Sequence, residues 1–143
     1  MGLLILILSV VLGAVHLRGG LVMLLMPREQ LLRNPATAWV ADRTAAQIRG
    51  IGLVRVVGAA GLFVPWYADE LLATSFTIWV FPVLTPVAAA LLGVIQFLVL
   101  LMHLRRDEKE FVPADIGLLI LAMAVAALRA VEFVIGCWGC APA

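Results

Sequence analysis

Long stretches without a single charged residue constrain this chain more than any other feature. The runs 3–15 and 83–102 contain no Asp, Glu, Lys or Arg, and about 20 apolar residues span the hydrocarbon core of a bilayer. Of the 143 residues, 64% are apolar and only 13% are charged, whereas about 25% of the residues in ordinary soluble domains are charged. The composition excludes a soluble globular protein and predicts an integral membrane protein.

Prolines and charged residues divide the chain into four predicted spans. At about 25 residues per span, the length predicts an all-α four-helix bundle that forms a single transmembrane domain over residues 1–143. Residues 27–46 mix charged and apolar side chains and should lie along the membrane interface. Residues 71–81 are apolar but too few to span, so we expect a partly embedded connector or a broken lead-in to the third helix there. The expected helices cover residues 3–26, 47–64, 83–104 and 113–136, and Pro27 and Pro65 end the first two.

The distribution of basic residues predicts the orientation of the bundle. Lys and Arg collect in loops that stay in the cytoplasm. Seven of the ten basic residues lie in or beside the first and third loops, whereas the second loop and both tails contain none. Both termini are therefore predicted to face outward, into the periplasm or the extracellular space. The seven residues are Arg28, Arg33, Arg43, Arg49, Arg105, Arg106 and Lys109.

The middle of the chain resembles a known family. The second predicted helix is rich in glycine and ends in proline, residues 84–90 read LTPVAAA, and the third helix closes on HLRRDE at residues 103–108. Over about residues 47–132, these features resemble the DoxX-like family of small four-helix bacterial membrane proteins. The resemblance implies a multi-pass protein of the bacterial inner membrane. For some members it also implies a role as a small subunit beside quinone-linked oxidoreductases of sulfur or oxidative-stress metabolism.

One residue departs from the pattern that this resemblance leads us to expect. The second predicted helix carries Arg55 where we expect an acidic residue. Proton or quinone chemistry assigned to that carboxylate is therefore not carried over to this chain.

Polar residues inside the predicted spans indicate a candidate ligand site. An ionisable group at the centre of a membrane helix costs at least about 2.5–3.5 kcal/mol, so it usually faces the bundle interior and has a partner. With a rise of about 1.5 Å per residue, four residues fall at similar depths in the inner half of the membrane. We find no Asp or Glu in the predicted spans at that depth. The four residues are His16, Arg18, Arg55 and Gln96.

Two interpretations of these four residues are open. They line a pocket for the head group of a phospholipid or quinone, or for another oxygen-rich ligand. Alternatively, the two arginines extend to lipid phosphates or bond backbone carbonyls of neighbouring helices.

The remaining charged residues of the spans favour structural roles. Arg129 and Glu132 are three residues apart on the fourth predicted helix, so they share a face and are expected to form a structural ion pair. The alternative is a contact with a partner subunit. His103 is expected to lie at the membrane boundary, as a residue that extends to the interface. We expect no metal site, because His103 and Cys137 lie at opposite ends of a core about 30 Å thick.

The two cysteines, Cys137 and Cys140, form a C-x-x-C motif that is compatible with a reversible disulfide. The motif follows a helix C-terminus, whose negative dipole end disfavours a reactive thiolate. No residue from 133 to 143 is basic, and the chain has no second thiol pair. We therefore expect a structural bridge or an idle dithiol, no catalytic residue and no covalently bound cofactor. A redox pair is the alternative.

The leading interpretation is a non-catalytic accessory subunit of a larger membrane assembly, a quinone-linked redox complex, and it rests mainly on the family resemblance. The expected partners are membrane lipids and other membrane protein subunits, or further copies of the chain. A net charge of +1 gives no electrostatic footprint for nucleic acid. One alternative is a stand-alone thiol-disulfide or quinone oxidoreductase that uses Cys137 and Cys140. Another is a small transporter or channel with Arg18 and Arg55 in its path.

Overall fold

The computed structural model describes residues 2–72 and 75–139, and it describes the backbone alone for residues 64–72, 75–82 and 135–139. Four helices are long and apolar enough to cross a membrane, and the described residues include no strand. The predicted all-α, four-helix membrane fold is confirmed. In chain order the elements are α1 (Gly2–Leu25), α2 (Arg28–Arg33), the 3-10 helix η1 (Pro35–Asp42), α3 (Ala45–Leu72), α4 (Ser75–Arg105) and α5 (Val112–Gly139).

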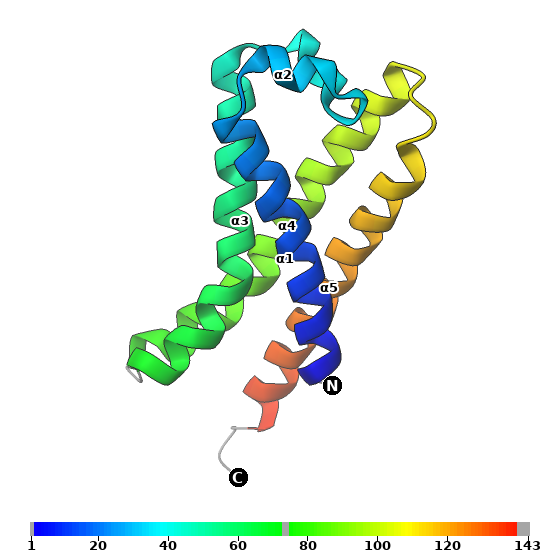
Figure 1. The fold of residues 1–143 in the computed structure, drawn as a ribbon. Helices are drawn as coiled ribbons and strands as arrows, with labels where there is room; N and C mark the ends of the chain where they lie inside the picture. The colour runs from blue at the N-terminus through cyan, green and yellow to red at the C-terminus, as the bar shows by residue number, and fades with distance from the viewer. Residues whose placement is uncertain (1, 73–74, 140–143) are drawn as a thin grey trace.

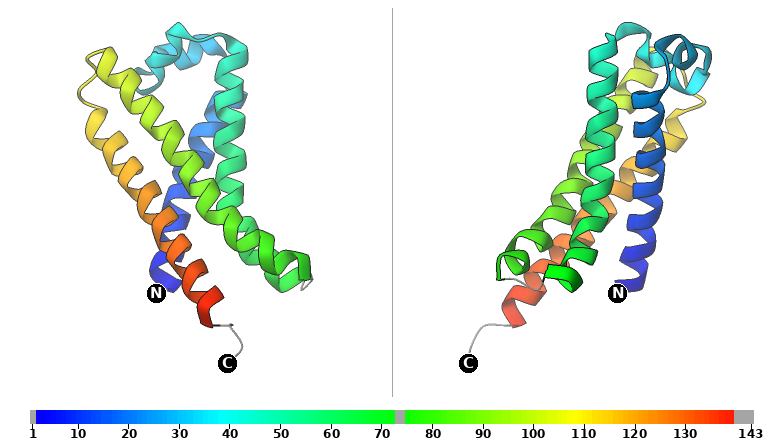
Figure 2. Two further views of the ribbon diagram at one scale, coloured as in Figure 1. Left: turned by 180° about the vertical axis from the view of Figure 1, so that it is seen from behind. Right: turned by 60° about the vertical axis from the view of Figure 1, so that its left-hand side comes forward.

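The four long helices form a bundle in which α3 and α4 each pack extensively on two neighbours. Helix α1 packs on α3, and α4 packs on both α3 and α5, while α1 and α5 contact each other less extensively. Both α2 and η1 lie at the same end of the bundle as the turn between α4 and α5 (Figure 1). The N-terminal end of α1 and the C-terminal end of α5 lie at the opposite end, as the rotated views in Figure 2 also show. We call the first of these the loop end, and it carries the basic loop residues.

Residues 27–46 close the loop end of the bundle. Trp39 and Val40 of η1 are buried there beside Leu31 of α2, in a cluster that also contains Met23, Ile48 and Val99. The side-chain hydroxyl of Thr44 accepts a hydrogen bond from the backbone N–H of Gln47. The side-chain oxygen of Gln47 accepts one from the backbone N–H of Thr44. This reciprocal capping box starts α3. The apolar residues of the segment therefore face the bundle.

The structure corrects two predicted helix ends. Helix α3 continues through Pro65 to Leu72, and α4 begins at Ser75 rather than at residue 83. Residues 75–81 form the start of α4, so they are a lead-in to the third predicted span rather than a separate connector, and the helix is not broken at Pro82. A proline removes one backbone hydrogen bond, but a chain inside a bilayer must keep the others within the segment, so transmembrane helices often continue through proline.

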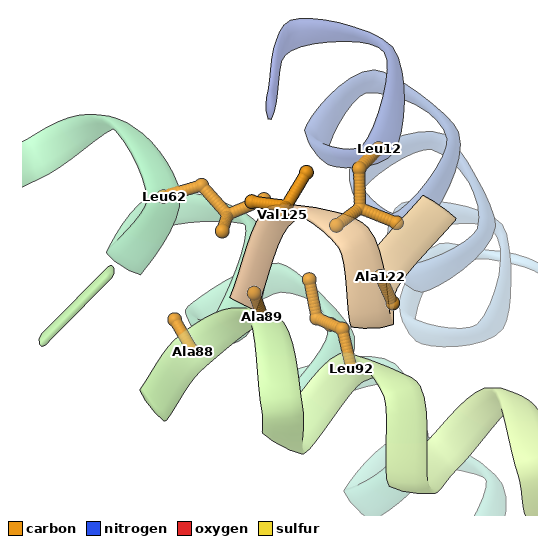
Figure 3. Packing of buried hydrophobic residues seen from close by; sticks show 7 residues of the cluster. All are labelled: Leu12, Leu62, Ala88, Ala89, Leu92, Ala122 and Val125. Atoms are coloured by element: carbon orange, nitrogen blue, oxygen red, sulfur yellow. The ribbon is translucent and has the colours of Figure 1, made fainter. Parts of the chain in front are cut away.

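The middle of the bundle is a tightly packed apolar core. Side chains from all four long helices meet there, as Figure 3 shows. Small residues bring the helix backbones close together, as is usual for membrane helices. A Cβ atom added at Gly52 would lie 2.9 Å from the backbone oxygen of Gly20, so α1 and α3 cross at these two glycines. The core residues are Leu12, Leu62, Ala88, Ala89, Leu92, Ala122 and Val125.

Candidate functional site

A layer of buried polar side chains separates the apolar core from the apolar cluster at the loop end. On α4, Gln96 lies between Leu92 of the core and Val99 of the loop-end cluster. His16 occupies the corresponding place on α1, and the two polar side chains are 2% and 1% exposed. Burying polar groups in an apolar bundle costs free energy unless they are hydrogen-bonded. The partners of these side chains therefore decide what the layer can do.

Asp115 is the centre of a hydrogen-bonded network in this layer. The side-chain amide of Gln96 donates to Oδ1 of Asp115 over 2.6 Å. The other carboxylate oxygen, Oδ2, lies 2.5 Å from Nδ1 of His103. Asp115 is 6% exposed and stands in the first turn of α5, where the helix dipole favours a negative charge. The carboxylate thus joins α5 to two positions of α4.

Arg55 brings a positive charge from α3 to the same network. Its Nη2 donates to Oε1 of Gln96 over 3.4 Å. A Cβ atom at position 19 would lie only 2.8 Å from Nη1 of Arg55, so Gly19 of α1 provides the space that the guanidinium occupies. His16 is one turn from Gly19 on the same face of α1, and it is close enough to Arg55 to interact with it electrostatically. Three helices therefore contribute to the surroundings of Arg55.

On the side of this layer formed by α1 and α3, two buried atoms have no hydrogen-bond partner among the described residues. One is Nε of Arg55, which carries a hydrogen, and the other is Nε2 of His16. The Nδ1 atom of His16 donates to the carbonyl oxygen of Leu12 over 3.0 Å, so Nε2 of the neutral imidazole is an acceptor. The α1–α3 side of the layer therefore offers one free donor and one free acceptor.

A second set of charges extends the network toward the surface at the loop end. Nε2 of His103 lies 3.7 Å from Oε2 of Glu108 in the turn between α4 and α5. Arg106 binds the other oxygen of Glu108 over 2.7 Å and Asp42 of η1 over 3.1 Å. The hydrogen bond that Arg106 donates to Glu108, together with the contact to Asp42, raises the pKa of Arg106 above its ordinary value. Arg106 therefore stays charged and links the turn to η1 through its contacts with Glu108 and Asp42.

The structure brings together three of the four residues that the sequence pointed to. His16, Arg55 and Gln96 belong to the buried layer, whereas the side chain of Arg18 is exposed on the outer face of α1. A helix turns by about 100° per residue, which separates Arg18 from His16 by roughly 200°. The expectation that all four residues share one layer is therefore wrong for Arg18. The transporter interpretation, which placed Arg18 and Arg55 in one path, stays a prediction.

Sequence reasoning missed the acidic residue of the layer. No Asp or Glu was expected in the spans at the depth of the arginines, but Asp115 accepts a hydrogen bond from Gln96, which in turn accepts one from Arg55. His103 was expected at the membrane boundary, yet it is 3% exposed and faces Asp115. One signal was available. Gln96 and His103 are seven residues apart, two turns of a helix, so they share one face of α4.

The remaining predicted site residues are an ion pair on α5 and the two cysteines. Nη1 of Arg129 is 2.9 Å from the carboxylate of Glu132, so the expected ion pair is present on α5, although its role is untested. Cys140 lies outside the described residues, and Cys137 is described by its backbone alone. The described part of the chain contains no group of three His, Cys, Asp or Glu side chains arranged to hold a metal ion.

Comparisons with known proteins identify a family but no individual relative. The family model described as the DoxX-like family matches residues 7–125, a range that includes α1, α3, α4 and the half of α5 that carries Asp115. No curated protein and no solved structure matches the chain.

Proposed function

The chain belongs to the DoxX-like family, and from that premise we propose that it is a non-catalytic accessory subunit of a larger redox assembly linked to quinone in the bacterial inner membrane. In this proposal the buried polar layer holds the oxygen-bearing head group of a quinone or a phospholipid. The sulfur and oxidative-stress oxidoreductases that accompany some family members are the model for the assembly.

One observation carries the binding part of the proposal. Nε of Arg55 and Nε2 of His16 are buried without a hydrogen-bond partner among the described residues, while Gln96 and Asp115 satisfy each other. Buried polar atoms in folded proteins almost always have a partner, which is often a water or a ligand. A ligand with an acceptor oxygen for the arginine and a hydroxyl group for the histidine would satisfy both atoms.

The chemistry of these atoms selects the class of ligand. Arg55 donates hydrogen bonds and carries a charge, so it suits a quinone carbonyl or a phosphate oxygen. Nε2 of neutral His16 accepts, so it suits the hydroxyl of a quinol or of a lipid head group. Side chains of α1 and α3 beside this layer, such as Leu17, Leu53 and Val57, are apolar and exposed. Such surroundings suit a ligand with a polar head and an apolar tail.

The shape of the bundle supports the subunit role. Helix α5 is the least buried of the four spans, with 11% of its most apolar window buried compared with 44% for α4. Its exposed residues include Ile120, Met123 and Val131. A membrane helix with such a face packs against lipid or against a neighbouring subunit. The proposed neighbour is therefore a protein that covers α5.

The orientation proposed for the chain follows from the charges at the loop end. The basic residues of the first and third loops lie at one end of the bundle, and both terminal helix ends lie at the other (Figure 1). The positive-inside rule then places the loop end in the cytoplasm and both termini in the periplasm.

The binding part is tested by the small molecules that co-purify with the protein. We would purify the wild type, Arg55→Gln and Arg18→Gln in mild detergent and quantify quinones and phospholipids by mass spectrometry. Arg18→Gln is the matched control, because it removes an arginine from the exposed face of the same bundle. We expect Arg55→Gln to lose one bound species that the other two proteins retain. Equal contents in all three proteins would contradict the proposal.

A further inference from the structure

His103 stands between two carboxylates that come from different parts of the chain. Its Nδ1 lies 2.5 Å from Oδ2 of Asp115 on α5, and its Nε2 lies 3.7 Å from Oε2 of Glu108 in the turn. The imidazole is 4% exposed, and the Glu108 side chain is 19% exposed. The ring thus separates a carboxylate inside the bundle from one that reaches solvent.

The distances show that the two sides of the ring differ. The contact with Asp115 is a hydrogen bond, whereas Nε2 of His103 and Oε2 of Glu108 are buried and have no hydrogen-bond partner among the described residues. A movement of less than about 1 Å would bring these two atoms within the usual hydrogen-bond range of 2.7–3.2 Å. Arg106 holds the opposite oxygen of Glu108 and so leaves Oε2 directed toward the ring.

We propose that His103 relays protons between Glu108 at the loop end and Asp115 inside the bundle. A proton on Oε2 of Glu108 passes to Nε2 of His103, while the hydrogen on Nδ1 passes to Oδ2 of Asp115. The imidazole stays neutral overall with its hydrogen moved from Nδ1 to Nε2, Glu108 becomes a carboxylate, and Asp115 becomes a carboxylic acid. The reverse transfers restore the first state, so no further reactant is needed.

The groups around the ring limit the relay to these three residues. Gln96 donates to Asp115 and binds Arg55, and neither an amide nor a guanidinium exchanges protons readily in proteins. Arg106 and Asp42 belong to the outer side, beyond Glu108. The ring of Phe111, 5.3 Å from the imidazole between centroids, covers it without titrating. The relay therefore joins the loop-end surface to Asp115 and ends there.

The second histidine of the chain, His16, lacks the two carboxylate neighbours that His103 has in the described part of the chain. His16 is also buried, but its Nδ1 binds the carbonyl oxygen of Leu12, which cannot take up a proton. No carboxylate is within ion-pair distance of His16 among the described residues. Because the chain contains two histidines, a spectrum that reports histidine nitrogens contains the relay residue and an internal reference.

The experiment measures hydrogen exchange on the imidazoles themselves. Protein labelled with 15N-histidine would be placed in lipid bilayers and transferred to deuterated buffer, and the loss of each ring N–H signal would be followed by NMR. Assignment uses His16→Gln. The variants are Glu108→Gln, which removes the outer carboxylate, and Glu110→Gln, which makes the same change at an exposed residue of the same turn.

The relay predicts a specific order of rates. The His103 signal should exchange faster than the His16 signal in the wild type. It should slow at least about tenfold in Glu108→Gln, because a positioned acid–base group accelerates proton transfer by orders of magnitude. Glu110→Gln should exchange like the wild type. An unchanged or faster rate in Glu108→Gln would overturn the relay and leave the contact as a structural one. This result does not depend on a bound head group.

Discussion

The side-chain amide of Gln96 donates a 2.6 Å hydrogen bond to Asp115, and this bond joins the middle of α4 to the first turn of α5. The same carboxylate lies 2.5 Å from His103, two turns further along α4. Asp115 thus contacts two residues of the neighbouring helix α4. Through Gln96 it also provides the negative charge that faces Arg55.

Asp115→Ala should destabilise the bundle, because it leaves the Gln96 amide and the His103 ring without their acceptor. Hydrogen bonds between membrane helices contribute about 0.6 kcal/mol on average and about 1.7 kcal/mol at most. We expect the free energy of unfolding to fall by about 1–3 kcal/mol for the two bonds together. Equilibrium unfolding in mixed detergent micelles measures this change.

Two variants make the Asp115 result specific. Asp115→Asn keeps one acceptor oxygen, so its free energy of unfolding should fall by about half as much as that of Asp115→Ala. Glu110→Ala changes an exposed acidic residue near the same helix start and should stay within about 0.5 kcal/mol of the wild type. Equal stability of Asp115→Ala and Glu110→Ala would show that the network does not stabilise the fold.

Gly52→Ala should separate α1 from α3. The added Cβ would lie 2.9 Å from the backbone oxygen of Gly20 and 3.0 Å from Cβ of Met23. A backbone atom cannot rotate away, so we expect a loss of about 1–3 kcal/mol in the free energy of unfolding, the usual range for overpacking. Thermal unfolding followed by circular dichroism measures the effect.

The matched control is Gly50→Ala in the same helix, where an added Cβ meets nothing within 4 Å. That change should stabilise α3 by up to about 1 kcal/mol, because alanine has the higher helix propensity. The two substitutions are therefore expected to act in opposite directions. A shift of the same sign for both would contradict a close crossing of α1 and α3 at Gly52.

Glu132→Gln should have a small effect on the isolated chain. The ion pair with Arg129 is partly exposed, at 19% and 32% for the two side chains, and such pairs contribute about 0.2–1 kcal/mol. We expect a loss below about 1 kcal/mol and no change in the polypeptides that co-purify. Loss of a co-purified polypeptide in Glu132→Gln would instead assign the pair to a partner interface.

Cys140→Ala should leave the retained small molecules and partners of the protein unchanged, because Cys137 lies in the last turn of α5, at its negative end, and residues 133–143 contain no basic residue. Non-reducing gels of the variant, expressed in its own membrane, show whether Cys137 captures another protein. A discrete mixed disulfide would favour the thiol-disulfide oxidoreductase.

Much of the fold could be predicted because membrane spans depend on composition over long windows. Uncharged runs locate α1 and the body of α4, and Pro27 does precede a change of direction. The ends of α3 and α4 could not be predicted in the same way. Pro65 favours the end of a helix in the sequence, but inside an apolar bundle the remaining backbone hydrogen bonds keep the chain helical.

The candidate site was less predictable, because it depends on which faces the helices present to one another. Depth along a helix places His16 and Arg18 together, yet their directions differ and only His16 is buried. His103 was expected at the membrane boundary, and no role was predicted for Asp115. The crossing of α4 and α5 turns both side chains inward, and this crossing depends on tertiary packing rather than on any local pattern.

Native mass spectrometry of the protein, extracted from its own membrane in mild detergent, tests the proposed function most directly. We predict a particle well above the 15.4 kDa of one chain, with other polypeptides and a quinone or phospholipid that is lost from the Arg55→Gln protein and kept by Arg18→Gln. A monomer or homo-oligomer without a retained quinone or phospholipid would contradict both the subunit role and the head-group site.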